Sequence, residues 1–515
     1  MSGLAASRSD TWSTQIARHA HNRPDHVAIR FRGTTLTWRE LDEHVQNLAG
    51  WLVRRQIGKG DRVGLVMGNR PEFLEVVYAC ARVGAIVVPI NFRLTAPEIE
   101  YILTDSGASL VVTESAFLEP VRAAASARPT EILGVTDDSP DEYRMIVEKP
   151  CAPVEFADVA VTDPAAIMYT SGTTGHPKGA VLTHENFAAT ADVIIDAWRL
   201  DATSDTVLAA TPLFHIGGFG TTTGPARLGL PLVIHPSTTF DPSELLDVIQ
   251  SEKVTATFMV PAQWQAICMV PDAGERGRSL RAVGWGAAPA PLWLLERLGE
   301  LFPEASVVAI FGQTEMSPVT CVLHGDEAVT KRGSVGRPVF TVSVRVVDED
   351  MNDVGADEIG EIVYRGKGLM HGYWNKPEAT EEAFAGGWFH SGDMVRRDAD
   401  GYIYVVDRKK DMIISGGENI YSAEVEMALS SHPAVRDVAV IGRRDDRLGE
   451  AVVAVIEPMD ITDPPSLESL VAHCRDRLAS YKKPRDLVVV GQLPRNATGK
   501  IIKGELRTSI PIPTT

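Results

Sequence analysis

The chain has 515 residues, more than a single hydrophobic core usually organises, so we expect at least two domains. Apolar residues make up 44% of the chain and charged residues 23%, a balance that is ordinary for a globular enzyme. The formal net charge of −18 argues against nucleic acid as the main partner.

Neither the cysteines nor the apolar runs indicate an exported or membrane-spanning protein. The five cysteines are scattered and form no CxxC pair, which fits reduced thiols and gives no metal site. The first thirty residues contain no apolar stretch long enough for a signal peptide, and runs such as 85–90 are far too short to cross a membrane. We therefore expect a cytoplasmic protein, while loose contact with a membrane surface stays open.

Strand and helix patterns alternate up to about residue 330. Proline at the first position predicts a helix over 71–83, and a capping box at 95–98 predicts a helix that continues to Leu103. Apolar runs predict strands at 61–67, 85–90, 165–168, 207–210, 232–234, 254–260, 281–285 and 306–310. This alternation predicts an α/β fold with largely parallel, doubly wound sheets.

The pattern changes in the last third of the chain. Short strands at 342–347 and 360–364 indicate a small β-rich subdomain, and a charged break falls near 407–411. Beyond the break we expect strands at 435–441, 452–456 and 487–490 and a helix at 466–478. The sequence thus predicts a large N-terminal domain, 1–409, followed by a small α+β C-terminal domain, 410–515.

The most informative segment is 169–179, which reads YTSGTTGHPKG. Glycine N–H groups, hydroxyls and one lysine are the groups that hold a polyphosphate, and the segment follows a buried strand. A flexible surface linker is the alternative, but it would need neither the lysine nor the strand. The spacing is not that of a Walker loop. The candidate phosphate-binding residues are Thr170, Ser171, Gly172, Thr173, Thr174, Gly175 and Lys178.

Three other unusual segments also follow predicted strands, at 212–218, 286–289 and 311–315. In open α/β sheets, ligands bind beyond the carboxyl ends of the strands. We therefore expect all four loops to meet at one edge of a sheet and to form one composite site.

Taken in order, these segments resemble the core motifs of the adenylate-forming superfamily, which contains acyl-CoA synthetases, luciferases and peptide-synthetase adenylation domains. Later motifs with the same likeness are 391–393, 407–408, 415–421 and 494–500. The resemblance extends from about residue 12 to 507, and within the superfamily it is greatest to actinobacterial-type medium- and long-chain fatty-acid–CoA ligases. It implies that ATP and CoA are co-substrates and that Mg²⁺ is the cofactor.

In the first step that the resemblance implies, a carboxylic acid and ATP form acyl-AMP and pyrophosphate. Lys500 would bridge the acid oxygen and the α-phosphate, and Glu315 with Thr170 would hold Mg²⁺, which takes few protein oxygens besides phosphates and water. Asp393 and Arg408 would bind the ribose. The remaining nucleotide-binding residues would be Gly286, Ala287, Ala288, Phe311, Gly312, Gln313 and Thr314.

In the second step, acyl-AMP and CoA form acyl-CoA and AMP after the mobile C-terminal domain rotates about Lys410. Ser415, Gly416 and Gly417 would then contact CoA, since glycine lets a pantetheine chain pass close to the backbone. His215 would line the passage between acyl group and thiol without acting as a general base. An ordinary glycine turn and a packed histidine are the plain alternatives for these motifs.

The candidate acyl-binding residues are apolar and rich in glycine, which favours a roomy, apolar acid. A medium- or long-chain fatty acid is the first expectation, and a bulky alicyclic or natural-product acid is an alternative. A stand-alone adenylation enzyme that loads a carrier protein, and a homodimeric assembly, also stay open. The residues are Phe214, Gly217, Gly218, Phe219, Val260, Gln263, Trp264, Gly284, Trp285 and Met316.

Overall fold

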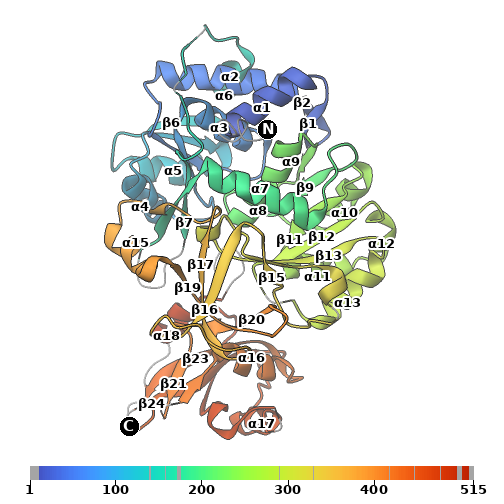
Figure 1. Cartoon of the computed structure of the whole chain (residues 1–515), viewed down its shortest axis with the longest axis vertical. Coiled ribbons are helices and arrows are strands. Elements are labelled where there is room, and N and C mark those ends of the chain that lie inside the picture. Colours follow the sequence, from blue (N-terminus) through green and yellow to red (C-terminus); the bar gives the residue numbers. More distant parts are fainter. Residues whose placement is uncertain are drawn as a thin grey trace. The chain divides into compact units, whose positions relative to one another are not determined.

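The structure is a computed structural model that describes residues 11–509 except 138–140, 153, 157, 171–175, 289, 329, 417, 446, 476 and 496–500. The chain forms two compact units. The first comprises residues up to 343 together with 365–384, and the second comprises 344–364 together with 385 onward. Figure 1 follows the chain through both units.

A seven-stranded sheet lies in the first unit (Figure 1). Its strands from β7 to β6 run parallel, whereas β8 and β18 are antiparallel to their neighbours. In sheet order the strands are β18 (Gly372–Tyr373), β8 (Lys178–Thr183), β7 (Pro164–Thr170), β4 (Ile86–Pro89), β3 (Arg62–Val66), β5 (Leu110–Glu114) and β6 (Glu131–Val135).

A nine-stranded sheet completes the first unit. It is parallel from β13 to β1, and its outer strands β14, β15 and β2 are antiparallel. In sheet order the strands are β15 (Arg337–Pro338), β14 (Cys321–Leu323), β13 (Ser306–Phe311), β12 (Ala282–Gly286), β11 (Ala256–Met259), β9 (Val207–Ala209), β10 (Leu232–Ile234), β1 (Val27–Phe31) and β2 (Thr34–Thr37).

Two helices begin where local sequence signals predict. Helix α3 (Pro71–Val83) begins at its proline and ends at Gly84 in a left-handed conformation. Helix α4 (Ala96–Ser106) begins with a capping box, in which the carboxylate of Glu98 accepts the backbone N–H of Thr95 at 2.7 Å. The other helices of the unit are α1 (Trp12–Asn22), α2 (Trp38–Arg54), α5 (Leu118–Ala125), α6 (Glu142–Glu148), α7 (His184–Trp198), α8 (Ile216–Thr221), α9 (Thr223–Leu228), α10 (Pro242–Ser251), α11 (Pro261–Cys268), α12 (Ala273–Arg276), α13 (Leu292–Leu301), α14 (Gly325–Ala328) and α15 (Pro377–Ala383).

A core of apolar side chains fixes the nine-stranded sheet to helices α10 to α13, which lie along it in Figure 1. Leu208 and Val283 from the strands pack with Leu246, Ile267 and Leu298 from the helices, and all five are at most 1% exposed. Burial of each such side chain contributes about 1.5–3 kcal/mol, so this core supports the strand ends that follow.

The second unit contains a four-stranded and a five-stranded sheet. The four-stranded sheet runs β16 (Val342–Val347), β17 (Ile359–Gly366), β19 (Phe389–Arg397) and β20 (Ile403–Arg408). The five-stranded sheet and its helices comprise β22 (Glu418–Ile420), β21 (Ile413–Ser415), β24 (Gly449–Pro458), β23 (Val435–Asp445), β25 (Asp486–Val489), α16 (Ser422–Ser430), α17 (Leu467–His473) and α18 (Lys503–Ser509).

The mixed α/β architecture with a large N-terminal and a small C-terminal part is as predicted. The expected largely parallel arrangement is confirmed: the central strands of both sheets of the first unit are parallel, and the antiparallel strands lie at the sheet edges. The compact units place 344–364 and 385–409 with the C-terminal residues, so the boundary at 409/410 stays a prediction. Along the described chain, no helix is both long and apolar enough to cross a membrane.

Candidate functional site

The predicted phosphate-binding segment closes a β-hairpin. Thr170 at the end of β7 lies directly opposite Lys178 at the start of β8, and the Thr170 hydroxyl donates to the Lys178 carbonyl at 3.4 Å. Residues 171–175, which carry the other predicted phosphate-binding groups, lie outside the described residues. The hairpin therefore brings together one hydroxyl and one ammonium group at the base of the loop.

Aromatic side chains anchor this hairpin to helix α4. The hydroxyl of Tyr169 donates to Asp105 at 2.7 Å, and the hydroxyl of Tyr101 donates to the carbonyl of Pro177 at 3.2 Å. The ring of Tyr101 also stacks on His176, with ring centroids 4.4 Å apart. Contacts on both sides of the loop thus fix where its two ends emerge from the sheet.

The expectation that four loops meet at the edge of one sheet is wrong. Segments 212–218, 286–288 and 311–315 follow β9, β12 and β13 of the nine-stranded sheet, while the phosphate hairpin belongs to the seven-stranded sheet. The sequence could not show this, because an apolar run before a glycine-rich loop does not reveal the sheet in which the strand pairs. The three loops do share one edge, since β9, β11, β12 and β13 are parallel neighbours.

Two glycines allow these strand ends to approach closely. A Cβ atom on Gly286 would overlap the carbonyl oxygen of Ile310, and one on Gly312 would overlap the carbonyl oxygen of Pro318. Between them, Ala287 adopts a left-handed backbone with φ +66°, and Ala287 and Ala288 are exposed. Backbone therefore forms much of the surface that we predict to flank the nucleotide.

The segment after β13 presents polar groups that can serve a ligand. Phe311, Gly312, Gln313 and Thr314 are half-buried. The buried side-chain nitrogen of Gln313 has no hydrogen-bond partner among the described residues. Because an unsatisfied buried donor is unfavourable, this amide is suited to donate to a bound molecule.

Glu315 lies in a short helical turn, Thr314–Met316, and its side chain is buried. The hydroxyl of Tyr373 donates to its carboxylate at 3.0 Å, and the backbone N–H of Met370 donates to its carbonyl at 2.8 Å. This turn also packs against β8, the strand that begins with Lys178. The fold thus places Glu315 next to the phosphate hairpin.

The donor set fits magnesium bound together with a nucleotide. The described residues hold no group of three His, Cys, Asp or Glu side chains that could enclose a metal ion. Mg²⁺ takes only one or two protein oxygens when phosphates and water supply the rest, and it prefers carboxylate and hydroxyl oxygen. Glu315 and Thr170 offer these two groups, so their assignment as metal ligands stays our proposal.

Asn69 positions the loop that carries His215. Its side-chain nitrogen donates to the carbonyl of Thr211 at 2.9 Å, and its side-chain oxygen accepts the N–H of Leu213 at 2.8 Å. Burial, with the positive charge of Arg93, lowers the pKa of His215 to about 4. His215 is therefore neutral at pH 7, which agrees with a lining role and not with that of a cation.

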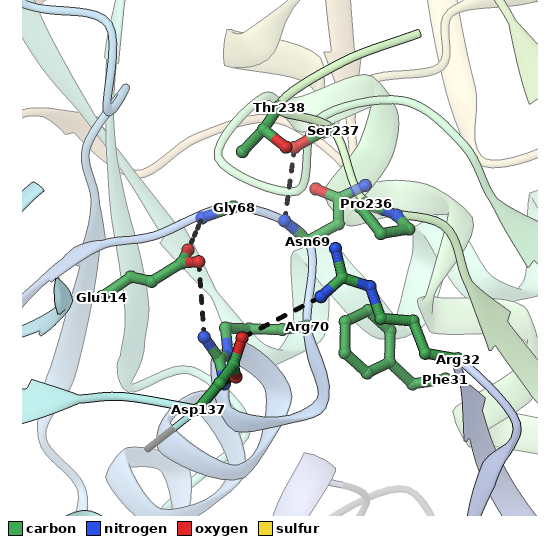
Figure 2. Close-up of a pocket in the computed structure, with 10 residues that line it drawn as sticks. All are labelled: Phe31, Arg32, Gly68, Asn69, Arg70, Glu114, Asp137, Pro236, Ser237 and Thr238. Carbon is green, nitrogen blue, oxygen red and sulfur yellow. Dashed lines mark hydrogen bonds and ion pairs between the residues drawn. The ribbon is translucent and has the colours of Figure 1, made fainter. Parts of the chain in front are cut away.

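A small polar pocket lies beside this loop, at the ends of β1, β3, β5 and β10 (Figure 2). It is partly open to solvent, and its cavity volume is only about 30 Å³. Arg70 contacts Glu114 at 3.4 Å and Asp137 at 2.9 Å, and Arg32 contacts Asp137 at 3.9 Å. These charges neutralise one another, so we interpret the pocket as support for the loop that contains Asn69.

The predicted acyl-binding residues fall into two groups. Phe214, Gly217, Gly218, Gly284, Trp285, Val260, Gln263 and Met316 lie at or near the carboxyl ends of β9, β11, β12 and β13. Trp264 and Phe219, by contrast, are fully buried: Trp264 donates to the carbonyl of Gly284 at 2.9 Å within the core, and Phe219 packs on Trp12 and Phe187. Packing accounts for these two residues without a ligand, and their acyl-binding role is an untested prediction.

Sequence reasoning missed Phe258, which is part of β11. A Cβ atom on Gly217 would lie 3.3 Å from its ring, and one on Gly286 would lie 3.2 Å from it. Its ring therefore lies between segment 212–218, which contains His215, and segment 286–288, which we predict to flank the nucleotide. A phenylalanine inside a strand is usually a core residue, so the sequence carries no signal for this position.

In the second unit, Asp393 and Arg408 lie opposite each other on the antiparallel strands β19 and β20. The guanidinium of Arg408 binds the carboxylate of Asp393 at 2.6 Å, and Asp393 is almost fully buried. The predicted pair is thus brought together. The neighbouring Asp407 accepts hydrogen bonds from Ser422 and Ala423 at the start of α16, which is a helix-capping role.

The predicted hinge and CoA-binding residues occupy turns of the same unit. Lys410 is exposed between β20 and β21. Gly416 turns the β21–β22 hairpin at φ +63° and donates its N–H to Leu448 at 2.7 Å, next to the buried Ser415. This geometry also fits an ordinary glycine turn without a ligand, so the contact with CoA stays a prediction. Gly417 lies outside the described residues.

Lys500 also lies outside the described residues, but the ends of its loop are described. Arg495 and Ile501 form an antiparallel bridge, and the N–H of Ile502 donates to Pro494 at 2.9 Å. These bonds close the loop 496–500 at its base.

The chain matches the family model described as AMP-binding enzyme over residues 16–374 and the model of the AMP-binding enzyme C-terminal domain over 424–500. It is 41% identical over 492 residues to a feruloyl-CoA synthase from Amycolatopsis sp, covering 95% of this chain and 97% of that one. It is 36% identical over 489 residues to a long-chain-fatty-acid–CoA ligase from Mycobacterium tuberculosis, covering 92% of each.

A solved structure is similar over nearly the same length. An O-succinylbenzoate coenzyme A synthetase from Bacillus subtilis, in complex with ATP and magnesium ion, has a TM-score of 0.84 and 31% identity, covering 96% of this chain and 98% of that one. The chain is thus similar to ligases of aryl acids as well as to ligases of fatty acids. The predicted special likeness to fatty-acid ligases stays a prediction.

Proposed function

The chain belongs to the AMP-binding enzyme family and is an AMP-forming acid–thiol ligase, and from this premise we propose that its acid carries an aromatic ring. The reaction has two steps. A carboxylate oxygen bonds to the α-phosphorus of ATP and pyrophosphate leaves; the sulfur of CoA then bonds to the acyl carbon, its proton is lost, and AMP leaves.

In the first step, Lys178 and Thr170, at the base of the hairpin, would bind the β- and γ-phosphates, and Glu315 with Thr170 would hold Mg²⁺. The bound metal offsets the negative charge of the triphosphate. Lys500 brings positive charge to the acid oxygen and the α-phosphate, where two anions must approach. The packing of the turn Thr314–Met316 against β8, the strand of Lys178, supports this arrangement.

Asp393 and Arg408 bind the ribose in this proposal. Carboxylate oxygen accepts hydrogen bonds from a diol, and the ion pair with Arg408 holds the Asp393 carboxylate in a fixed orientation for that role. In the second step, Ser415 and Gly416 contact the pantetheine chain after the C-terminal domain has rotated about Lys410.

The position of Phe258 is the observation that carries the aromatic substrate. Its ring packs between Gly217 and Gly286, where a larger residue would have to displace it. Phe214 is held edge-on against Phe92 with ring centroids 5.3 Å apart, which keeps a second ring at this edge. Flat, rigid walls of this kind favour a planar acyl group, such as an arylpropenoic acid, through stacking.

A fatty acid is the second candidate. The relative from Mycobacterium tuberculosis is named for long-chain fatty acids, and most of the predicted acyl-binding residues are apolar. A flexible chain would gain from burial alone and would not need the ring of Phe258. A bulky alicyclic acid, and a carrier protein as acceptor in place of CoA, are the remaining alternatives.

The test is AMP release by the purified protein with ATP, Mg²⁺ and CoA across matched acids. We expect ferulate and related arylpropenoates to give a kcat/KM at least roughly tenfold above octanoate and palmitate. Phe258→Ala should reduce the ratio of kcat/KM for ferulate to kcat/KM for palmitate. Val248→Ala, a change elsewhere in the same unit, should leave this ratio unchanged. If the wild type and both variants prefer palmitate, the proposed aryl acid is wrong and the substrate is a fatty acid.

A further inference from the structure

A short segment, 370–374, is hydrogen-bonded to the turn that follows the nine-stranded sheet and to a strand of the seven-stranded sheet. The N–H of Met370 donates to the carbonyl of Glu315 at 2.8 Å, and the N–H of Trp374 donates to the carbonyl of Gly179 at 2.8 Å. Glu315 follows the nine-stranded sheet, and Gly179 is the second residue of β8 in the seven-stranded sheet. The segment therefore fixes the carboxylate loop relative to the phosphate hairpin.

The side chain of Tyr373, in the middle of this segment, contacts both charged groups. Its hydroxyl donates to the carboxylate of Glu315 at 3.0 Å, and the ammonium of Lys178 lies 5.1 Å from the centre of its ring. Its backbone pairs with Ala180, and its N–H donates to the hydroxyl of Thr380 at 2.9 Å. Bonds to the backbone of Tyr373 thus fix the point from which its side chain leaves β18.

We propose that Tyr373 is a positioning residue that holds the Glu315 carboxylate and the Lys178 ammonium in place for the pyrophosphate end of magnesium–ATP. Opposite charges in a shielded site attract each other strongly, and a direct ion pair would cancel both. Tyrosine offers each group a neutral partner instead: a hydroxyl for the carboxylate and a ring face for the cation. The hydroxyl thus orients the Glu315 carboxylate for the metal, and the ring orients the Lys178 ammonium for a phosphate.

This inference rests on the proposed function, which assigns Glu315 to the metal and Lys178 to the phosphates. It adds that two parts of one side chain have separate roles. The hydroxyl acts on the metal-binding carboxylate, and the ring acts on the phosphate-binding ammonium. The two parts can be removed separately, because Tyr373→Phe deletes only the hydroxyl while Tyr373→Leu deletes the ring as well.

The chain offers a matched control for the hydroxyl. Tyr143, on helix α6, donates its hydroxyl to the carboxylate of Glu75 at 2.8 Å, and both residues are buried in the same unit. Tyr143→Phe removes the same type of hydrogen bond away from the candidate site. It should lower the stability of the fold without changing the metal dependence.

The experiment measures the affinity for ATP by calorimetry, with Mg²⁺ and with the metal chelated, in the wild type and the three variants. Tyr373→Phe should weaken binding of magnesium–ATP roughly tenfold and leave binding of metal-free ATP unchanged. Tyr373→Leu should weaken both, because Lys178 loses its support. All variants should convert pre-made acyl-AMP and CoA at the wild-type rate, since that half-reaction contains no pyrophosphate.

Two results would overturn the inference. One is wild-type affinity of Tyr373→Phe for magnesium–ATP, and the other is equal loss in both half-reactions, which would indicate a purely structural role. Glu315→Gln and Lys178→Ala separate this failure from that of the proposed function. If those two variants also bind magnesium–ATP normally, the assigned site itself is wrong; if they bind it weakly, only the role of Tyr373 fails.

Discussion

The two units of the chain present their candidate site residues on different kinds of structure. In the first unit they follow parallel strands, on loops that leave neighbouring carboxyl ends, or flank a hairpin loop. In the second unit they lie on antiparallel strands and tight turns, as with Asp393 opposite Arg408 and Gly416 between β21 and β22. The first unit thus gathers its candidate residues at neighbouring strand ends, whereas the second presents them as a cross-strand pair and a separate turn.

This difference predicts that variants of the second unit separate the two half-reactions, and the largest effect should come from Lys500→Ala. Loss of one charge that stabilises the first transition state should lower acid-dependent exchange of pyrophosphate into ATP roughly 10²–10³-fold. Pre-made acyl-AMP should still react with CoA. Lys367→Ala, which removes an exposed lysine of the first unit, is the control. Undiminished exchange in Lys500→Ala would refute the role of that lysine.

Lys410→Pro should have the opposite effect at the second step. Proline restricts the backbone at the exposed turn between β20 and β21, so exchange should persist while thioester formation falls by at least roughly tenfold. Lys410→Ala keeps the backbone freedom and should support both steps. If Lys410→Pro forms the thioester at the wild-type rate, the hinge lies elsewhere.

In the first unit, Asn69→Ala should act on stability and on the histidine loop together. It leaves the carbonyl of Thr211 and the N–H of Leu213 without their buried partner, which costs about 1–3 kcal/mol of unfolding free energy. Urea unfolding measures the loss, and the KM for the acid should rise while affinity for ATP stays constant. Asn352→Ala, an exposed asparagine of the second unit, should change neither.

The smallest predicted effect is a pH dependence of stability. Burial lowers the pKa of His19 and of His184 to about 4, so the unfolded chain binds protons that the native chain rejects. Stability from these residues is therefore complete above pH 6.5 and is lost as the pH falls toward 4. At pH 5.5 the loss should be about 1 kcal/mol for each histidine. His184→Gln should reduce this dependence in urea unfolding, and His26→Gln, at an exposed position, should not.

Local signals in the sequence predicted much of the fold. Proline at position 71 and the capping box at 95–98 set the starts of α3 and α4, because both act through bonds within one helix turn. Strand runs such as 232–234 coincide with β10. The antiparallel pairing of the edge strands β8 and β18 could not be predicted, since hydrophobic periodicity does not encode pairing direction.

The candidate site shows the same limit. The resemblance to the adenylate-forming superfamily led to the assignment of Glu315 and Asp393, because both residues fall within its motifs. The motifs did not identify Asn69 or Tyr373, which act through contacts with residues far away in the chain. A tyrosine or asparagine in a loop is common, so only the folded arrangement reveals such supporting roles.

The central claim is that the acid is activated by bonding its own oxygen to AMP. The most direct test supplies ferulate labelled with oxygen-18 in the carboxylate, together with ATP, Mg²⁺ and CoA, and follows the label by mass spectrometry. Acyl-AMP formation predicts that each molecule of AMP released carries one labelled oxygen and that pyrophosphate carries none. Unlabelled AMP accompanying feruloyl-CoA, or label in phosphate or pyrophosphate, would contradict the account.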